Sequence, residues 1–490
     1  MPKKFYLTTA IPYVNAPPHI GFALELVQAD AVARWQRSRK RDVFFLTGAD
    51  ENSLKNVRAA EAEHLTTQQL VDRNTQRFID LAAALNVSNS AFIRTSAATH
   101  HQGAQALWQA CRKDDIYKKS YQGLYCVGCE TFYLPKDLVG GTCPEHRTVP
   151  ESVNEENYFF RLSAYQEKLA RLVTRGELAI MPEGRRNEIL SFISMGLEDF
   201  SLSRSRGRAK DWGVSLPGDP GQVMYVWFDA LANYITALGY GQGKRASPQF
   251  KRYWPADLHV IGKGISRFHA VYWPAMLMSA RLPLPKKIFV HGYITVNGGK
   301  ISKSLGNAVD PFALVSSFGA DPVRYYLLRY IHSTQDSDFS RVQMEDAYQA
   351  DLANGLGNLV SRVTGLIEQN KLDVTIARPK RPSDALVAAM DSFAFNDAVK
   401  LVWEEIKRWD TFIANTEPWK LAKDGKTAKL NTVVRQAAGG LSTISHWLTP
   451  FLPETAGKIQ TALAATPIVK VPPMFPRRKS GEAGSMQHEA

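Results

Sequence analysis

The first residues of the chain hold a strand, a proline-containing loop and a helix in immediate succession, and this order constrains the fold more than any other feature. Lys4–Thr9 has the composition of a short buried strand. Apolar side chains then recur at the spacing of one helix face, at Ile20, Leu24, Val27 and Ala31. A strand that leads at once into a helix predicts an α/β fold.

The next strand supports this class. Asp42–Gly48 is a continuous apolar run bounded by polar residues, as expected for a strand buried on both faces of a parallel sheet. Helical patterns follow over Thr67–Leu85 and Ala97–Asp114, with loop and a short strand between them. The alternation predicts a parallel sheet in the α/β class.

Two candidate functional positions follow these strands. Pro17 and Pro18 place His19 and Gly21 in the first helical turn, where free N–H groups and the positive end of the dipole favour a polyphosphate. Asp50 comes directly after the second strand, where binding residues of open α/β sheets collect. From these residues alone, capping roles for His19 and Asp50 remain alternatives.

Three of the four cysteines form a pattern with one histidine. Cys126-x2-Cys129 is followed, after thirteen residues, by Cys143-x2-His146. Paired ligands of this kind predict one structural Zn²⁺ in a closed tetrahedral shell, and unrelated free thiols are the alternative. Cys111 lies apart in a helical pattern. With so few cysteines there is no disulfide framework, which indicates a reducing compartment.

Ile116 to about Gly221 lacks the strand–helix alternation, so we interpret it as an inserted subdomain. It contains a basic group, Arg185, Arg186, Arg204, Arg206, Arg208 and Lys210. These side chains can follow a phosphate backbone, and a solvated charged face is the alternative. The net charge of +13 over 490 residues also favours a polyanionic partner such as nucleic acid.

After the insertion the α/β pattern returns. Val223–Ala230 reads as a strand leading into a helix, and Leu258–Gly264 as a strand with a glycine-rich turn. Ile288–Tyr293 is a further strand, and Asn297-Gly298 predicts a tight hairpin turn. The lysine loop Lys300–Ser304 that follows carries charges suited to a triphosphate, although such loops are also often merely solvated.

Two stretches together resemble the signatures of the class I aminoacyl-tRNA synthetases, HIGH and KMSKS. They are Pro-Pro-His-Ile-Gly-Phe at 17–22 and Lys-Ile-Ser-Lys-Ser at 300–304. Within that class the sequence resembles that of the methionyl-tRNA synthetases from about Lys4 to Phe451. The matching motifs are Thr-Ala-Ile-Pro-Tyr-Val-Asn, Thr-Gly-Ala-Asp-Glu, the cysteine pattern, Tyr-Val-Trp-Phe-Asp-Ala and His-Gly-Tyr-Ile-Thr-Val-Asn-Gly. The resemblance implies a Rossmann-like catalytic domain with a zinc-knuckle insertion and an α-helical bundle that binds the anticodon.

The implied activity is that of a methionine–tRNA ligase in translation, which forms methionyl-adenylate from L-methionine and ATP and then charges tRNA(Met), including the initiator. Mg²⁺ accompanies the ATP. The implied catalytic residues are His19, Lys300 and Lys303. The implied ATP-binding residues are His19, Gly21, Phe22, Gly262, Lys300, Ser302 and Lys303. The implied methionine-binding residues are Ala10, Ile11, Tyr13, Asp50, Trp227, Ala230, Tyr234 and His269.

The last third of the chain has a helical pattern to about Thr466. Asp310-Pro311 and Asp321-Pro322 each predict a helix start, with the aspartate as N-cap and proline at the first helical position. The resemblance assigns anticodon binding to Asn358, Arg362 and Trp419. From the sequence alone, a core role for Trp419 and a local ion pair for Arg362 are alternatives.

The expected domains are a first catalytic half (1–115), the insertion (116–221), a second catalytic half (222–309), a linking helical subdomain (310–345), the anticodon-binding bundle (346–466) and a disordered tail (467–490). We expect a cytosolic monomer that does not enter membranes, because the N-terminus has no presequence and no apolar run is long enough to span.

Departures from the family pattern leave one rival function. Phe22, Ile301 and Gly264 stand where the family commonly has histidine, methionine and aspartate. Gly264 has no carboxylate to bind the ATP ribose, so Glu51 or a neighbouring residue would have to supply one. A catalytically impaired tRNA-binding protein is therefore the alternative. Ligases for leucine, isoleucine or valine are disfavoured, because the insertion is short for an editing domain.

Overall fold

The computed structural model describes residues 2–128, 131–133, 135–144, 147–243, 245–300 and 309–477. The chain forms two compact units. The first comprises Met1–Ala83 and Val87–Gly292, and the second comprises Ala84–Asn86 and Tyr293–Ala490. The boundary at Tyr293 lies before the lysine loop, whereas the sequence patterns predict a domain change at 310.

The first unit is built on a six-stranded sheet in the order β3-β2-β1-β12-β13-β7, and every pairing in it is parallel. Its strands are β1 (Lys4–Thr9), β2 (Asp42–Ala49), β3 (Ala91–Arg94), β7 (Ala179–Met181), β12 (Leu258–Gly262) and β13 (Lys287–His291). The central strand places Leu7 between Phe45 and Leu258. The predicted parallel α/β sheet is confirmed.

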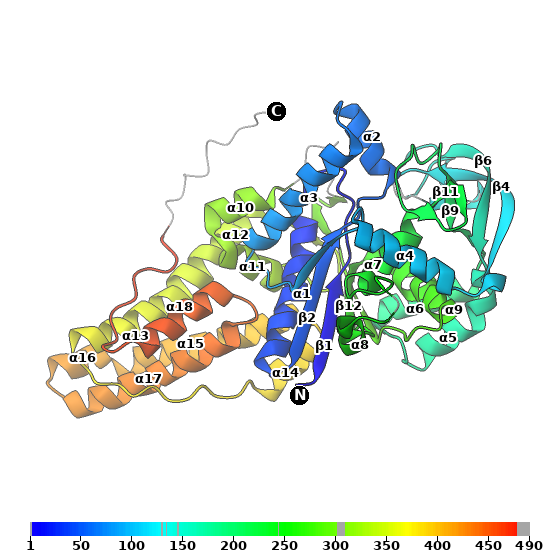
Figure 1. Cartoon of the computed structure of the whole chain (residues 1–490). Helices are drawn as coiled ribbons and strands as arrows, with labels where there is room; N and C mark the ends of the chain where they lie inside the picture. Colours follow the sequence, from blue (N-terminus) through cyan, green and yellow to red (C-terminus); the bar gives the residue numbers. More distant parts are fainter. Residues whose placement is uncertain are drawn as a thin grey trace. The chain divides into compact units, whose positions relative to one another are not determined.

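Helices cover both faces of this sheet. Figure 1 shows α1 (Ile20–Ser38) on one side and α4 (Ala98–Ala110), α7 (Val226–Thr236) and α9 (Trp273–Ser279) on the other. The other helices near the sheet are α2 (Leu54–Ala62), α3 (Thr67–Ala84) and α8 (Pro248–Tyr253). The predicted strand at Val223–Ala230 is wrong from Tyr225 on, because β11 ends at Met224 and α7 begins at Val226.

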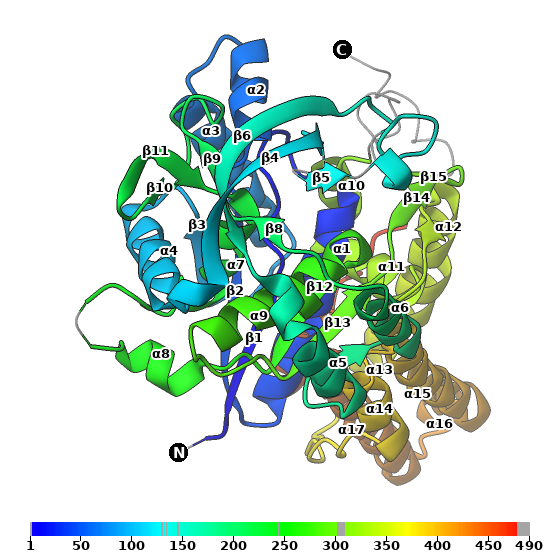
Figure 2. The same ribbon diagram turned by 90° about the vertical axis from the view of Figure 1, so that its right-hand side faces the viewer.

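The insertion contains two antiparallel sheets, in which β4 and β6 form a long pair (Figure 2). One sheet has the order β5-β4-β6-β8, with β4 (Ile116–Cys126), β5 (Thr131–Tyr133), β6 (Glu151–Phe160) and β8 (Phe200–Ser201). The other has the order β10-β11-β9, with β9 (Ser203–Ser205), β10 (Ser215–Leu216) and β11 (Asp219–Met224). Helices α5 (Gln166–Thr174) and α6 (Glu183–Ser194) flank β7, which pairs with β13. The insertion thus supplies an edge strand to the catalytic sheet.

The second unit begins with the predicted hairpin. Asn297 and Gly298 both have positive φ, 53° and 71°, between β14 (Ile294–Val296) and β15 (Gly299–Lys300). A two-residue strand, β16 (Ser337–Asp338), also pairs with β14. The helices are α10 (Pro311–Phe318), α11 (Ala320–Arg329), α12 (Arg341–Ala347), a π-helical stretch (Tyr348–Gly357), α13 (Asn358–Gln369), α14 (Asp384–Asp391), α15 (Phe395–Thr416), α16 (Pro418–Lys423), α17 (Thr427–Leu448) and α18 (Pro453–Ala464).

The two predicted helix starts have different outcomes. Asp310 caps α10 as expected, since its carboxylate accepts from the Phe312 N–H at 2.9 Å. The prediction for Asp321 is wrong, because Asp321 is the second residue of α11. The N-cap of this helix is Gly319, whose φ is 90°. The buried Asp321 carboxylate instead accepts from the Thr455 N–H at 2.6 Å and ties α11 to α18.

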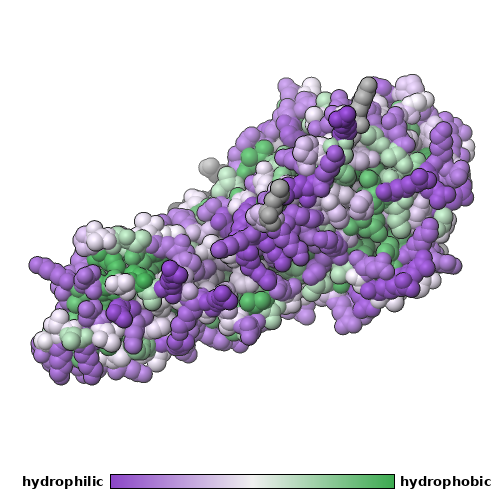
Figure 3. Space-filling view, turned by 60° about the horizontal axis from the view of Figure 1, so that its bottom comes forward, coloured by the Kyte–Doolittle hydropathy of each residue, from purple (hydrophilic) through white to green (hydrophobic). Residues whose placement is uncertain are grey.

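Polar residues predominate on the face drawn in Figure 3, with hydrophobic residues in small areas between them. Within the part of the chain that the structure describes, every helix is too short or too polar to span a bilayer.

Candidate active site

The residues predicted to bind methionine lie in the first unit, beyond the carboxyl ends of the parallel strands. Ala10 follows β1 and Asp50 follows β2, while Gly262, which is predicted to bind ATP, ends β12. The strand order reverses between β1 and β12, and such a switch point is where open α/β sheets bind ligands. The fold therefore brings the two predicted halves of the methionine site to one edge.

A buried carboxylate, which the sequence patterns did not single out, holds the Ala10 turn. Glu25 of α1 accepts from the Ala10 N–H at 2.7 Å and lies 2.9 Å from Nε2 of His291 at the end of β13. Glu25 and His291 are both buried. This network joins β1, α1 and β13, so Glu25 positions the loop that carries Ala10, Ile11 and Tyr13.

His19 is the N-cap of α1. Its Nδ1 accepts from the Gly21 N–H at 3.0 Å, so the proton of the neutral imidazole is on Nε2. The ring is exposed at the start of the helix, beside backbone N–H groups and the positive end of the helix dipole. The capping role of His19 is thus observed, and its role in nucleotide binding stays a prediction.

Phe22, in contrast, faces the interior. Its ring is 8% exposed and meets Phe78 of α3 edge-on at 5.1 Å. The side chain therefore packs α1 against α3, and any contribution of Phe22 to nucleotide binding is left to its backbone.

Tyr13 and Asp50 are neighbours through a parallel β-bridge, and the Asp50 N–H donates to the Pro12 carbonyl at 2.8 Å. The Tyr13 ring meets the Trp227 ring edge-on at 6.4 Å, and Trp227 stacks flat on Phe268 at 3.7 Å. Asp50 is 3% exposed. The arrangement places a buried carboxylate beside aromatic walls, as a site for an ammonium group with an apolar side chain requires.

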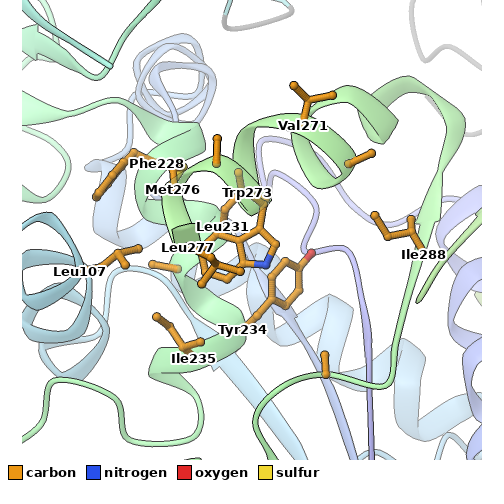
Figure 4. Packing of buried hydrophobic residues seen from close by; sticks show 14 of the residues in the cluster. Leu107, Phe228, Leu231, Tyr234, Ile235, Val271, Trp273, Met276, Leu277 and Ile288 are labelled. Atoms are coloured by element: carbon orange, nitrogen blue, oxygen red, sulfur yellow. The ribbon is translucent and has the colours of Figure 1, made fainter. Parts of the chain in front are cut away.

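Tyr234 and His269, both predicted to bind methionine, form a buried hydrogen-bonded pair. His269 Nδ1 lies 3.0 Å from the Ile265 carbonyl, to which it must donate, so Nε2 accepts from the Tyr234 hydroxyl at 2.6 Å. Burial lowers the pKa of His269 to about 4, which keeps the ring neutral. Figure 4 shows the Tyr234 ring beside Trp273 within the apolar cluster. Ala230 lies one turn before Tyr234 on α7.

A second carboxylate lies near Asp50. Asp229 is fully buried, accepts from the Asn52 side-chain amide at 3.2 Å, and leaves Oδ1 without a partner. Burial and then the charge of Asp50 raise the pKa of Asp229 well above its usual value. Only the fold reveals this pair, because the two aspartates are far apart in the sequence.

The structure describes two of the four predicted zinc ligands. Cys126 and Cys143 are both buried. The Cys126 Sγ lies 3.9 Å from the Thr148 hydroxyl, and the Cys143 thiol lies 3.6 Å from the Tyr133 hydroxyl. Cys129 and His146 lie outside the described residues, and among those described no group of three metal-ligand side chains is found.

The structure describes only some of the residues predicted to bind ATP. The backbone of Lys300 belongs to β15, while Ser302 and Lys303 lie outside the described residues. Gly264 is exposed in the turn after β12. Glu51 is unsuited to replace its missing carboxylate, because Glu51 is fully buried and accepts from Thr75 at 2.5 Å and Arg94 at 2.8 Å.

In the second unit the predicted anticodon-binding residues gather on α13 and α16. Asn358 and Arg362 lie one turn apart on α13, and the Arg362 guanidinium lies over the Trp419 ring at 5.6 Å. The Trp419 side chain is 44% exposed, which excludes a core role. Arg362 also pairs with Asp410 at 2.9 Å, so the alternative of a local ion pair holds in part.

Comparison with known proteins shows the family of the chain. The family model described as tRNA synthetases class I (M) matches residues 5–150 and 146–364. The chain belongs to this family of class I tRNA synthetases.

The following three similar proteins all carry the name of a methionine–tRNA ligase or methionyl-tRNA synthetase. The methionine–tRNA ligase of Brucella suis biovar 1 (strain 1330) is 44% identical, covering 94% of this chain and 92% of the relative. That of Rhizobium meliloti (strain 1021) is 42% identical, covering 98% and 99%. A solved structure of Mycobacterium tuberculosis methionyl-tRNA synthetase in complex with methionyl-adenylate has a TM-score of 0.88 and 40% identity, covering 97% of this chain and all of the other.

Proposed function

We propose that this chain is a methionine–tRNA ligase. An oxygen of the methionine carboxylate attacks the α-phosphorus of ATP, and the bond to pyrophosphate breaks. A hydroxyl of the tRNA 3′-terminal ribose then attacks the carbonyl of methionyl-adenylate, forms the ester and releases AMP. The observation that supports the proposal is the edge-on contact of Tyr13 and Trp227 beside the buried Asp50, in a chain that matches a methionine–tRNA ligase over nearly its full length.

The pocket divides the recognition of methionine among its residues. Asp50 receives the ammonium group, and the aromatic rings enclose the thioether, which packs well against ring edges. Burial raises the pKa of Tyr234 and lowers that of His269, so both groups are neutral, and their mutual hydrogen bond fixes the orientation of the two rings. Ala10, Ile11 and Ala230 complete its walls.

The ATP side relies on donors to the phosphates. His19 Nε2 and the first N–H groups of α1, where Gly21 admits close approach, donate to a phosphate. Lys300 and Lys303, with Ser302, neutralise the triphosphate charge that shifts in the transition state. Gly262 approaches the nucleotide through its backbone. Mg²⁺ enters with ATP, held by phosphates and water.

The second unit binds the tRNA. Trp419 stacks an unpaired anticodon base, and Asn358 and Arg362 contact base edges, which is how single-stranded loops are recognised. The net charge of +13 supports this partner. We further propose a cytosolic monomer that acts on elongator and initiator tRNA(Met).

The insertion holds one structural Zn²⁺ through Cys126, Cys129, Cys143 and His146. The donor set fits, because three thiolates and an imidazole form a closed shell, and the two described thiols are buried within the insertion. The ion supplies fold stability to the knuckle. Cys126→Ser should lower the zinc content measured by atomic emission, with Cys111→Ser as the control, and full zinc content in Cys126→Ser would refute this ligand set.

Amino-acid-dependent ATP–pyrophosphate exchange tests the function. We expect exchange with methionine and little with leucine, isoleucine or valine. Absence of methionine-dependent exchange in folded, zinc-loaded protein would overturn the proposal. Measured charging of tRNA(Met) in the same preparation then tests the second step.

A further inference from the structure

The turn after β2 holds Asp50 through a residue that no proposed step uses. Asn52 is buried, and its backbone N–H donates to Oδ1 of Asp50 at 3.3 Å. A bond of this kind, from the residue two positions further on, restricts the rotation of an aspartate side chain. The direction of the Asp50 carboxylate therefore depends on where Asn52 lies.

The side chain of Asn52 is itself held in place by two hydrogen bonds. Its Nδ2 donates to the Thr95 carbonyl at 3.0 Å and to Oδ2 of Asp229 at 3.2 Å. Because an amide nitrogen carries only two hydrogens, these bonds use both of them. Thr95 directly follows β3, and Asp229 belongs to α7. The amide thus fastens the turn to two further elements of the fold.

The backbone around Asp50 does not depend on this amide. The Glu51 N–H donates to the Thr95 hydroxyl at 2.7 Å, and the Asn56 side chain donates to the Asp50 carbonyl at 3.1 Å. These bonds stay in place when the side chain of Asn52 is replaced. Such a replacement should therefore turn the Asp50 carboxylate without unfolding the turn.

Asp229 is the second buried carboxyl group of this network. It lies on α7 between Trp227 and Ala230, both of which are predicted to bind methionine. It is fully buried, and its Oδ1 has no hydrogen-bond partner among the residues that the structure describes. Burying a carboxyl group with an unpaired oxygen costs free energy. The bond to Asn52 therefore explains Asp229 better than a contribution to stability does.

We propose that Asn52 and Asp229 are positioning residues, which orient the Asp50 carboxylate for the ammonium group of methionine. The inference rests on the proposed function, in which Asp50 receives that group. Asp229 accepts from the Asn52 amide, and the Asn52 N–H holds Asp50, so both residues act through Asp50. A ligand that lacks the ammonium group gains nothing from them.

Asn52→Leu tests the proposal, because it removes the amide and nearly keeps the volume of the side chain. Methionine-dependent ATP–pyrophosphate exchange gives the KM values for methionine and ATP. Inhibition of the exchange is compared for methioninol and for the same alcohol without its amino group. We expect the KM for methionine and the inhibition constant of methioninol to rise by about 10-fold or more, with no change for ATP or for the alcohol without the amino group. A merely structural role would weaken both alcohols alike.

Asn157→Leu is the matched control. Asn157 of β6 is also buried, and its amide donates to the Glu155 carboxylate at 3.2 Å, the same distance as in the bond from Asn52 to Asp229. Asn157→Leu should keep the wild-type KM values and inhibition constants. Asn52→Ala provides the same comparison if Asn52→Leu does not fold.

Variants of Asp229 test the other end of the network. Asp229→Ala should reproduce the loss of Asn52→Leu, and Asp229→Asn, which keeps one acceptor oxygen, should lose less. In an Asp229→Ala background, Asn52→Leu should add little, because the two residues act as a unit.

Unchanged inhibition of Asn52→Leu by methioninol, or an equal loss for both alcohols, would overturn the proposal. Equal losses for Asp229→Asn and Asp229→Ala, or additive losses in the double variant, would also overturn it. Absence of exchange in the wild type would instead refute the proposed function itself.

Discussion

Adding a single methyl group in Gly21→Ala should lower the activity of this protein and leave its stability nearly unchanged. A Cβ at this position would lie 2.8 Å from Cε1 and 3.0 Å from Nδ1 of His19, which is too close for carbon atoms. Because the His19 ring is exposed, it can rotate away while the helix stays in place. Gly21→Ala should therefore displace the imidazole and break its hydrogen bond with the Gly21 N–H.

The effects on stability nearly cancel. Loss of a helix cap costs about 1 kcal/mol, and replacing a helical glycine by alanine recovers about 0.5–1 kcal/mol. Activity has no such compensation, since a misplaced donor to the transferring phosphate costs about 3 kcal/mol, or roughly 100-fold in rate. We expect a nearly unchanged free energy of unfolding with a large loss of adenylate formation.

Urea unfolding and methionine-dependent ATP–pyrophosphate exchange measure the two quantities. Gly184→Ala is the matched control, because Gly184 lies in α6 with nothing within 4 Å of the added methyl group. In a His19→Ala background, Gly21→Ala should cause no further loss. Wild-type exchange by Gly21→Ala, or an additive loss in the double variant, would refute the reasoning.

Three further outcomes follow from the same structure. Tyr234→Phe leaves the buried His269 Nε2 without its hydrogen-bond donor, which costs about 1–3 kcal/mol. The KM for methionine should therefore rise by roughly 10-fold while the KM for ATP stays unchanged. An equal rise in both KM values would contradict this. Burial lowers the pKa of His100 to about 3, of His269 to about 4 and of His259 well below its usual value, so the unfolded chain binds more protons below pH 6.5. The free energy of unfolding should keep its full value above about pH 6.5 and fall by about 1.4 kcal/mol per pH unit per histidine towards pH 4. If the urea midpoints of His100→Gln fall with decreasing pH as steeply as those of the wild type, this reasoning is wrong. Trp419→Ala should weaken tRNA(Met) binding by about 1–3 kcal/mol without changing exchange, and unchanged binding would remove Trp419 from the anticodon site.

The strands, the tight turn and the position of the candidate site could be predicted from local patterns. Apolar runs identified β1 and β2, and Asn297-Gly298 identified the hairpin, because these signals act between near neighbours. Asp321 shows the limit of such reasoning. Its Asp-Pro pair has the form of a helix start, but Gly319 provides the turn and Thr455 takes the carboxylate.

By itself the sequence determined the class of the fold and the position of the first helix, and it predicted the residues that would bind methionine. Tertiary structure alone decided which of the charged groups are buried together. Glu25 meets His291, and Asn52 links Asp50 to Asp229, across separations of up to 266 residues. Arg204 of β9 faces aromatic rings, whereas Arg206, just after that strand, pairs with Asp211 at the surface. These differences depend on desolvation and long-range hydrogen bonds, which no local pattern encodes, and they set the charge of the pocket.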